Sequence, residues 1–209
     1  MGWGVERRGS VIVISAPSGA GKTTLVKRLL ASAPDLVFSV SYTTRERRSE
    51  EVEGRDYFFV SRPTFEGLIE QGEFIEWAQV VGQLYGTALS MVKAAQAAGR
   101  DILLDIDVQG HAQVKQRLPE SVSVFVLPPS FAELERRLRC RALDSESDIR
   151  RRLQAARREV ARWPEYDYLI VNEDLALATQ DLAALVAAAR LRRASQEARV
   201  REIEKTFAE

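Results

Sequence analysis

Short apolar runs alternate with helix-like patterns along most of the chain. The runs at residues 11–14, 102–106, 122–127 and 168–171 are largely apolar on both faces and rich in branched side chains. Such runs are typical of strands buried inside a parallel sheet. The helices predicted between and beside them span residues 22–31, 88–98, 108–118 and 131–139. We therefore expect an α/β fold, with a parallel sheet flanked by helices and joined by right-handed crossovers.

Residues 41–87 interrupt this alternation. Short strand-like runs and one short helix, near residues 64–70, are separated by Gly54, Gly72 and Gly82. This pattern predicts a small mixed-sheet insertion.

The last third of the chain is predicted to be mainly helical. Residues 145–163 indicate one helix, with Ser145 as N-cap and Asp148 three residues later, a start similar to a capping box. Beyond Asp174 we expect one or two helices and a frayed end. The apolar stripe of the first helix comprises Ile149, Leu153, Ala156, Val160 and Trp163.

Composition narrows the class of protein without identifying it. The 209 residues include 30 Lys and Arg and 30 Asp and Glu, so the formal net charge is zero. That balance argues against a broadly basic nucleic-acid or membrane-surface binder. The single cysteine, Cys140, and the single histidine, His111, exclude a disulfide framework and a Cys/His zinc site. No stretch reaches the roughly 18 apolar residues of a membrane span, so we expect a reduced, cytoplasmic protein.

The strongest local motif is Ala-Pro-Ser-Gly-Ala-Gly-Lys-Thr at residues 16–23, between the first predicted strand and the first predicted helix. In a P-loop NTPase, successive backbone N–H groups of such a loop surround phosphate oxygens, and the helix N-terminus adds a positive dipole. Lys22 would reach the β and γ phosphates, and the Thr23 hydroxyl would bind Mg²⁺. Ala16 stands where the strict pattern has glycine. The alternative is a glycine-rich turn with an exposed lysine.

Further motifs distinguish between classes of phosphate-binding protein. The N-K-x-D motif by which GTPases read guanine does not follow the loop. Instead a spaced series comprises Thr43, Arg45, Arg48, Glu51, Gly54, Tyr57 and Phe59, followed by Phe74-Ile75-Glu76-Trp77, Tyr85-Gly86-Thr87 and Asp105-Ile106-Asp107-Val108-Gln109-Gly110. From residue 10 to residue 190 these motifs and their order resemble the guanylate kinase family, whose members use ATP to phosphorylate GMP.

The resemblance implies a division of the chain and an acceptor site. Residues 41–87 would bind GMP, residues 137–155 would form a helical lid, and residues 1–40, 88–136 and 156–209 would form the nucleotide-binding core. The GMP phosphate would be held by Arg45, Arg48, Tyr57 and Tyr85, because guanidinium groups pair with phosphate through two hydrogen bonds.

The guanine edge would be read by Ser41, Glu76 and Thr87. A carboxylate at Glu76 can accept hydrogen bonds from guanine N1–H and the 2-amino group, and adenine offers no such pair of donors. Asp107 would contact the substrate, while the role of Asp105 stays open. The alternatives are a solvated charge run for the arginines, core packing for the tyrosines, a polar strand face for Glu76 and strand-end capping for Asp107.

On the donor side, the resemblance implies that lid arginines close over ATP. Arg137 and Arg141 are four residues apart and would share a helix face, and Arg152 lies on the next helix. At Ala142-Leu143 the family pattern has Gly-Thr, a departure that bears on lid geometry. Asn172 matches a position near the ATP base or ribose, with a strand-end turn as the alternative. The implied ATP-binding residues are Ala16, Pro17, Ser18, Gly19, Ala20, Gly21, Lys22, Thr23, Thr24, Arg137, Arg141 and Asn172.

The reaction implied is transfer of the γ-phosphoryl group of ATP to GMP or dGMP, which recycles GMP in purine nucleotide metabolism. The acceptor phosphate is already anionic, so no general base is required. ATP and GMP together carry about six negative charges, so cations must stabilise the transferring group. These would be Mg²⁺, Lys22, Arg45, Arg137, Arg141 and Arg152.

The expected partners are these small nucleotides, without nucleic acid or membrane, for a monomer or homodimer. Three other functions stay open. One is a non-catalytic, guanylate-kinase-like domain that binds phosphorylated peptides. The second is a P-loop protein that binds nucleic acid through the arginines of residues 150–162. The third is a kinase for a different monophosphate.

Overall fold

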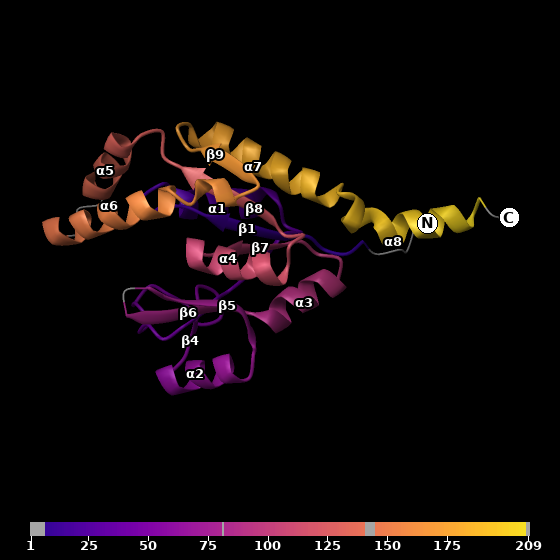
Figure 1. The fold of residues 1–209 in the computed structure, drawn as a ribbon, viewed down its shortest axis with the longest axis horizontal. Coiled ribbons are helices and arrows are strands. Elements are labelled where there is room, and N and C mark those ends of the chain that lie inside the picture. Colours follow the sequence, from indigo (N-terminus) through magenta and orange to yellow (C-terminus); the bar gives the residue numbers. More distant parts are fainter. Residues whose placement is uncertain (1–6, 81, 141–144, 208–209) are drawn as a thin grey trace.

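A five-stranded parallel sheet forms the centre of the molecule in the computed structural model, which describes residues 7–80, 82–140 and 145–207 (Figure 1). The strand order is β2-β7-β1-β8-β9. The predicted parallel sheet is confirmed, and all four predicted strands belong to it. The prediction that residues 168–171 form a buried strand is wrong, because this strand is at the edge of the sheet and only Ile170 is buried. Strand β2 was not predicted, because two residues are too few to give an apolar pattern. The strands are β1 (Val11–Ser15), β2 (Val37–Phe38), β7 (Ile102–Asp105), β8 (Val122–Leu127) and β9 (Tyr168–Val171).

Helices cover both faces of this sheet. Ile12 and Ile14 of β1 pack toward α1 and α7, whereas Val11 and Val13 pack toward α3 and α4. Burial on both faces explains why β1 is a continuous apolar run. None of the helices in the described ranges is long and apolar enough to cross a bilayer. The four helices are α1 (Lys22–Ser32), α3 (Leu89–Ala97), α4 (Val108–Arg117) and α7 (Leu175–Arg190).

The predicted mixed-sheet insertion is confirmed as a second sheet of order β4-β3-β6-β5. Strands β3 and β4 are parallel, and the other two pairs are antiparallel. Phe65 of helix α2 (Arg62–Glu70) packs on this sheet against Phe74 and Leu84. Helix α4 lies between the two sheets and contacts both β1 and β5 (Figure 1). The strands are β3 (Tyr42–Thr43), β4 (Phe58–Phe59), β5 (Phe74–Val80) and β6 (Gln83–Ala88).

Helices α5 (Phe131–Cys140) and α6 (Glu146–Val160) pack together at one end of the molecule. The predicted N-cap is confirmed, since the Ser145 hydroxyl accepts the Asp148 N–H at 3.2 Å. The predicted extension of this helix to Trp163 is wrong. A short 3₁₀ helix, Trp163–Glu165, follows α6, and Trp163 is 48% exposed. Pro164 explains the break, because proline has no N–H to donate to the Val160 carbonyl and its ring would clash with that carbonyl in an α-helix.

The prediction of one or two helices beyond Asp174 is confirmed by α7 and a second helix. Helix α8 (Arg193–Lys205) follows α7 and has no buried side chain. Figure 1 shows it extending away from the body of the molecule.

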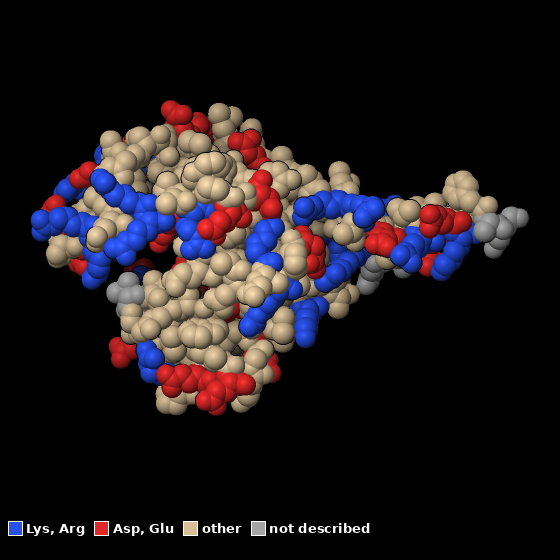
Figure 2. Space-filling view, in the orientation of Figure 1, with Lys and Arg blue, Asp and Glu red and all other residues tan. Residues whose placement is uncertain are grey.

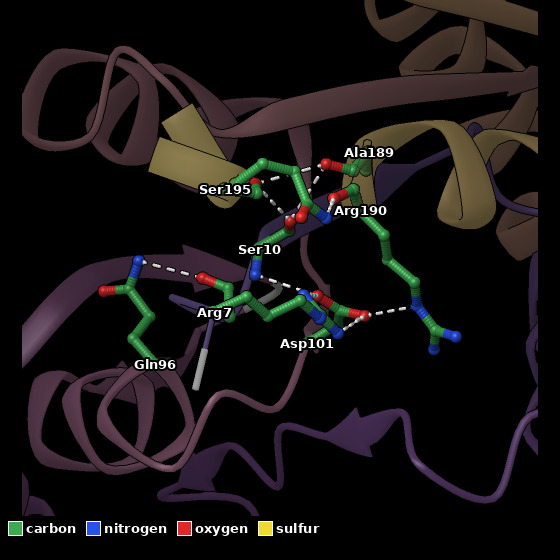
Figure 3. Close-up of polar contacts among 9 residues, drawn as sticks. Arg7, Ser10, Gln96, Asp101, Ala189, Arg190 and Ser195 are labelled. Carbon is green, nitrogen blue, oxygen red and sulfur yellow. Dashed lines mark hydrogen bonds and ion pairs between the residues drawn. The ribbon is translucent and has the colours of Figure 1, made fainter. Parts of the chain in front are cut away.

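A buried ionic cluster around Asp101 joins the segment before β1 and the end of α7 to the sheet (Figure 3). The Asp101 carboxylate is fully buried just before β7. Arg7 donates to it at 2.7 and 2.8 Å, Arg190 at 2.7 Å, and the Ser10 N–H at 2.9 Å. Sequence patterns did not predict this cluster, because its partners lie 89 or more residues away from Asp101. A buried charge persists only when it is paired and hydrogen-bonded, so these contacts are structural.

Candidate active site

The phosphate loop connects β1 to α1 in a conformation that requires glycine. Gly19 and Gly21 have φ values of +96° and +91°, a region in which residues with a Cβ are strained. A Cβ at Gly21 would lie 2.4 Å from Asn172 Nδ2. The methyl group of Ala16 packs against the main core, so the departure from glycine is accommodated. The loop therefore places backbone N–H groups and the start of α1 where an anion can bind.

Lys22 lies in the first turn of α1 and forms an ion pair with Asp105 at the end of β7. The two side chains are 20% and 21% exposed, and both line the same cleft. Asp105, whose role the sequence left open, therefore holds the ammonium group of the loop lysine.

Asn172 and Arg137 stabilise the phosphate loop from the side of β9 and α5. Asn172 Nδ2 donates to the Ala20 carbonyl at 2.7 Å. Arg137 donates to the Asn172 carbonyl at 3.0 Å and to the Ala20 carbonyl at 3.4 Å, and Glu133 accepts from Arg137 Nε at 2.7 Å. The Asn172 amide is thus engaged with the loop backbone. Asn172 and Arg137 also line a pocket of about 370 Å³ together with Gly19, Gly21, Thr24, Arg136, Cys140, Glu173 and Leu175.

The other predicted lid arginines are placed differently. Arg141, with Ala142 and Leu143, lies outside the described residues. Arg152 is half-buried on α6. Positively charged side chains gather over the end of the molecule that carries α5 and α6 (Figure 2, left). Arg150, Arg151, Arg157 and Arg158 are exposed, as expected for a solvated helix face. Arg162 lies beyond the end of α6, is half-buried and forms an ion pair with Glu165.

A cleft of about 350 Å³ brings predicted donor and acceptor residues together. It extends from Lys22 at the start of α1 to Glu76 on β5, and therefore lies between the two sheets. The opposed phosphate and guanine sites that the sequence predicted thus share one space. The other predicted residues that line this cleft are Thr23, Ser41, Tyr57, Tyr85, Asp105 and Asp107.

Glu76 is the most deeply buried carboxylate of this cleft. Its side chain is on β5, opposite Thr87 of β6, and the residue is only 4% exposed. Burial raises the pKa of Glu76 to about 7; the charge of Asp107 adds to this rise in pKa, and Thr87 opposes it. Glu76 is therefore not the polar outer face of a strand. It can accept hydrogen bonds from a base, but its ionisation changes near neutral pH.

The arginines of the insertion differ, since Arg45 is half-buried and ion-paired, whereas Arg47 and Arg48 are exposed, as in a solvated charge run. Arg45 donates to Glu51 at 2.6 Å, and its guanidinium carbon lies 5.4 Å from the Tyr57 ring centroid. The second Glu51 oxygen accepts the Arg48 N–H at 2.9 Å. The rings of Tyr57 and Tyr85 are 5.9 Å apart, edge to face. Arg45 therefore adjoins the cleft through Tyr57, whereas the Arg48 side chain is exposed to solvent.

The Asp107 side chain both caps a helix and lines the cleft. Its carboxylate caps α4 by accepting the N–H groups of Gln109 at 2.9 Å and Gly110 at 2.8 Å. It also lines the cleft. Asp107 therefore is a helix cap, as the alternative interpretation held, and it also lies next to the candidate site.

Oxygen ligands in the cleft fit a magnesium ion bound with a nucleotide. The Thr23 hydroxyl and the Asp105 carboxylate both line it. Within the described ranges, no group of three or more His, Cys, Asp or Glu side chains could hold a metal ion. Mg²⁺ typically uses one or two carboxylates plus substrate phosphates and water, so the residues fit an ion that enters with its nucleotide.

Sequence reasoning missed the carboxylates that hold the arginines. Glu133 precedes Arg137 by four residues, a helical spacing that could have revealed the pair. Glu51 was part of the recognised series but had no assigned role. His111 is buried and stacks on Tyr166 at 3.8 Å, away from the cleft lining.

Comparisons with known proteins agree on one family. A family model described as guanylate kinase matches residues 8–189. The guanylate kinase of Rhodopseudomonas palustris (strain BisB5) is 50% identical over 194 residues, covering 92% of this chain and 89% of its own. That of Myxococcus xanthus (strain DK1622) is 53% identical over 186 residues, covering 88% and 89%. The crystal structure of guanylate kinase from Anaplasma phagocytophilum superposes with a TM-score of 0.76 at 35% identity, covering 91% and 90%.

Proposed function

Because the chain belongs to the guanylate kinase family, we propose that it transfers the γ-phosphoryl group of ATP to GMP and dGMP, giving ADP and the diphosphate. The observation that carries this proposal is the single cleft that runs from Lys22 in the phosphate loop to Glu76 on β5. A phosphate-binding lysine and a buried carboxylate face the same space. The intact loop also disfavours a non-catalytic, phosphopeptide-binding domain.

Catalysis then consists of positioning and charge neutralisation. The loop N–H groups and Lys22 bind the β and γ phosphates of ATP, while Arg45, Arg48, Tyr57 and Tyr85 bind the phosphate of GMP. An anionic acceptor oxygen attacks the γ-phosphorus in line, and no general base is needed. Arg137, Arg141 and Arg152 supply further positive charge to the transferring group.

Magnesium would be held by the Thr23 hydroxyl, with Asp105 close enough to the loop to assist. When bound, the ion would supply positive charge that neutralises the phosphate oxygens. The pairing of Lys22 with Asp105 keeps both groups at the loop before a nucleotide enters.

Residues 41–87 and 137–155 are proposed to close over the core when both nucleotides bind. Closure excludes water, which would otherwise hydrolyse ATP, and brings lid arginines to the phosphates. The packing of α5 on α6 through Leu134, Leu138 and Ile149 makes these two helices one unit that can move together.

Glu76 gives this proposal a pH signature. With a pKa of about 7, the ionised fraction that can accept guanine N–H groups increases about tenfold between pH 6 and pH 8. We therefore expect KM for GMP to fall about tenfold over this range, as measured by steady-state kinetics at saturating ATP.

The Glu76→Gln variant is the control for the pH signature. Its amide does not ionise, so KM for GMP should be high and nearly independent of pH, apart from the titration of the GMP phosphate itself. KM for ATP should change little. Equal pH profiles in the wild type and the variant would refute the guanine role of Glu76.

A further inference from the structure

We propose that Gly110 and Gln113 of helix α4 are positioning residues that determine guanine specificity by fixing the Glu76 carboxylate. This inference rests on the proposed function of Glu76 as the group that reads guanine. Neither residue contacts the base in this proposal; both act through β5.

Gly110 provides the space that the carboxylate occupies. A Cβ at this position would lie 2.4 Å from Glu76 Oε2 and 3.1 Å from Glu76 Cδ, with Ile106 Cβ at 3.3 Å on another side. Distances below 3.0 Å to a Cβ require a neighbour to move. Any larger residue at position 110 must therefore displace Glu76.

The backbone does not require glycine at this position. Gly110 is not one of the glycines with positive φ, and it lies in the first turn of α4, where its N–H donates to Asp107. Glycine within a helix is less favourable than alanine. The contact with Glu76 is thus the feature that distinguishes glycine from alanine here.

Gln113 holds the strand that carries Glu76. Its Oε1 accepts the Trp77 N–H at 3.2 Å, and its Nε2 donates to the Trp77 carbonyl at 2.7 Å. One side-chain amide therefore satisfies both backbone groups of the residue that follows Glu76. Strand β5 is at the edge of its sheet, where backbone groups otherwise face solvent.

A third contact extends the same face of α4 along β5. Arg117 donates to the Phe74 carbonyl, two residues before Glu76. Residues 110, 113 and 117 share one helix face, and Asp107 caps the same helix at the cleft. Helix α4 thus links the phosphate-binding core to the strand that carries Glu76, and sets both the space and the orientation of its carboxylate.

The test compares GMP with inosine monophosphate, which lacks the 2-amino group. Wild-type enzyme is expected to prefer GMP in kcat/KM, and Gly110→Ala should reduce that preference at least about tenfold, because the displaced carboxylate no longer pairs with both donors. Gln113→Ala should also reduce the preference for GMP. KM for ATP should change less than twofold in both variants. A loss of stability alone would lower kcat/KM for GMP and for inosine monophosphate by the same factor, and the ratio of the two values would not change.

Two matched variants control for substitution in a helix. Gly67→Ala in α2 introduces a Cβ that meets nothing within 4 Å, and Gln116→Ala removes an exposed amide from α4 itself. Both should keep the wild-type ratio. A wild-type ratio in folded Gly110→Ala, or in Gln113→Ala if Gly110→Ala does not fold, would overturn this inference. A wild-type enzyme that does not prefer GMP would instead refute the proposed guanine site.

Discussion

Replacement of Lys22 with alanine is expected to lower kcat for GMP-dependent ATP turnover by about a thousandfold. Lys22 is the lysine of the phosphate loop, and it lines the cleft where we propose that the γ-phosphoryl group is transferred. Its partner Asp105 is partly exposed, so water can replace the lost pairing and the fold should persist. Steady-state kinetics and thermal unfolding of the same preparation measure both effects.

Lys93→Ala is the matched control for this variant, because Lys93 is an exposed lysine on helix α3. It should retain wild-type turnover. If Lys22→Ala kept more than a tenth of wild-type kcat, the loop lysine would not stabilise the transferring group.

Replacement of Asp101 with alanine is expected to lower the free energy of unfolding by about 3–5 kcal/mol, the usual result of breaking a buried ion pair. Arg7 and Arg190 would each lose their buried partner, and the Ser10 N–H would lose its acceptor (Figure 3). For a chain of this length the melting temperature should fall by roughly 10 °C. Urea denaturation measures the free energy directly.

The contribution of Asp101 should also depend on pH. Burial alone would raise the pKa of Asp101, but hydrogen bonds from Arg7, Ser10 and Arg190 outweigh it and lower the pKa below its ordinary value. The stabilisation is then complete above about pH 4 and is lost as the pH falls further.

Glu197→Ala provides the comparison, because it removes an exposed ion pair with Arg201 on α8. Exposed pairs contribute little to stability. Equal losses in the Asp101 and Glu197 variants would show that the buried cluster contributes no more to stability than an exposed ion pair.

Local patterns predicted the parts of the site whose structure depends on residues close by in the sequence. The phosphate loop required only an apolar strand before Ala16 and a helix after Gly21, and both are present. The arginine and tyrosine series indicated the acceptor side. Strands β2 and β3 were not predicted, because their two-residue length is fixed by pairing with distant strands rather than by their own pattern.

Long-range contacts determined what the sequence could not reveal. The depth of Glu76, and hence its raised pKa, depends on α4 lying against β5. The engagement of Asn172 with Ala20 joins residues 152 positions apart. At Trp163 a local pattern was misleading. This apolar residue has helical spacing from Val160, so the predicted helix was extended to it, although α6 ends at Val160.

The most direct test of guanylate kinase activity is a coupled assay of ATP turnover with GMP, dGMP, AMP, CMP and UMP as acceptors. The proposed function predicts rapid formation of ADP with GMP and dGMP, and kcat/KM values at least about a hundredfold lower with the other three. Comparable turnover with AMP, or no turnover with GMP, would contradict it.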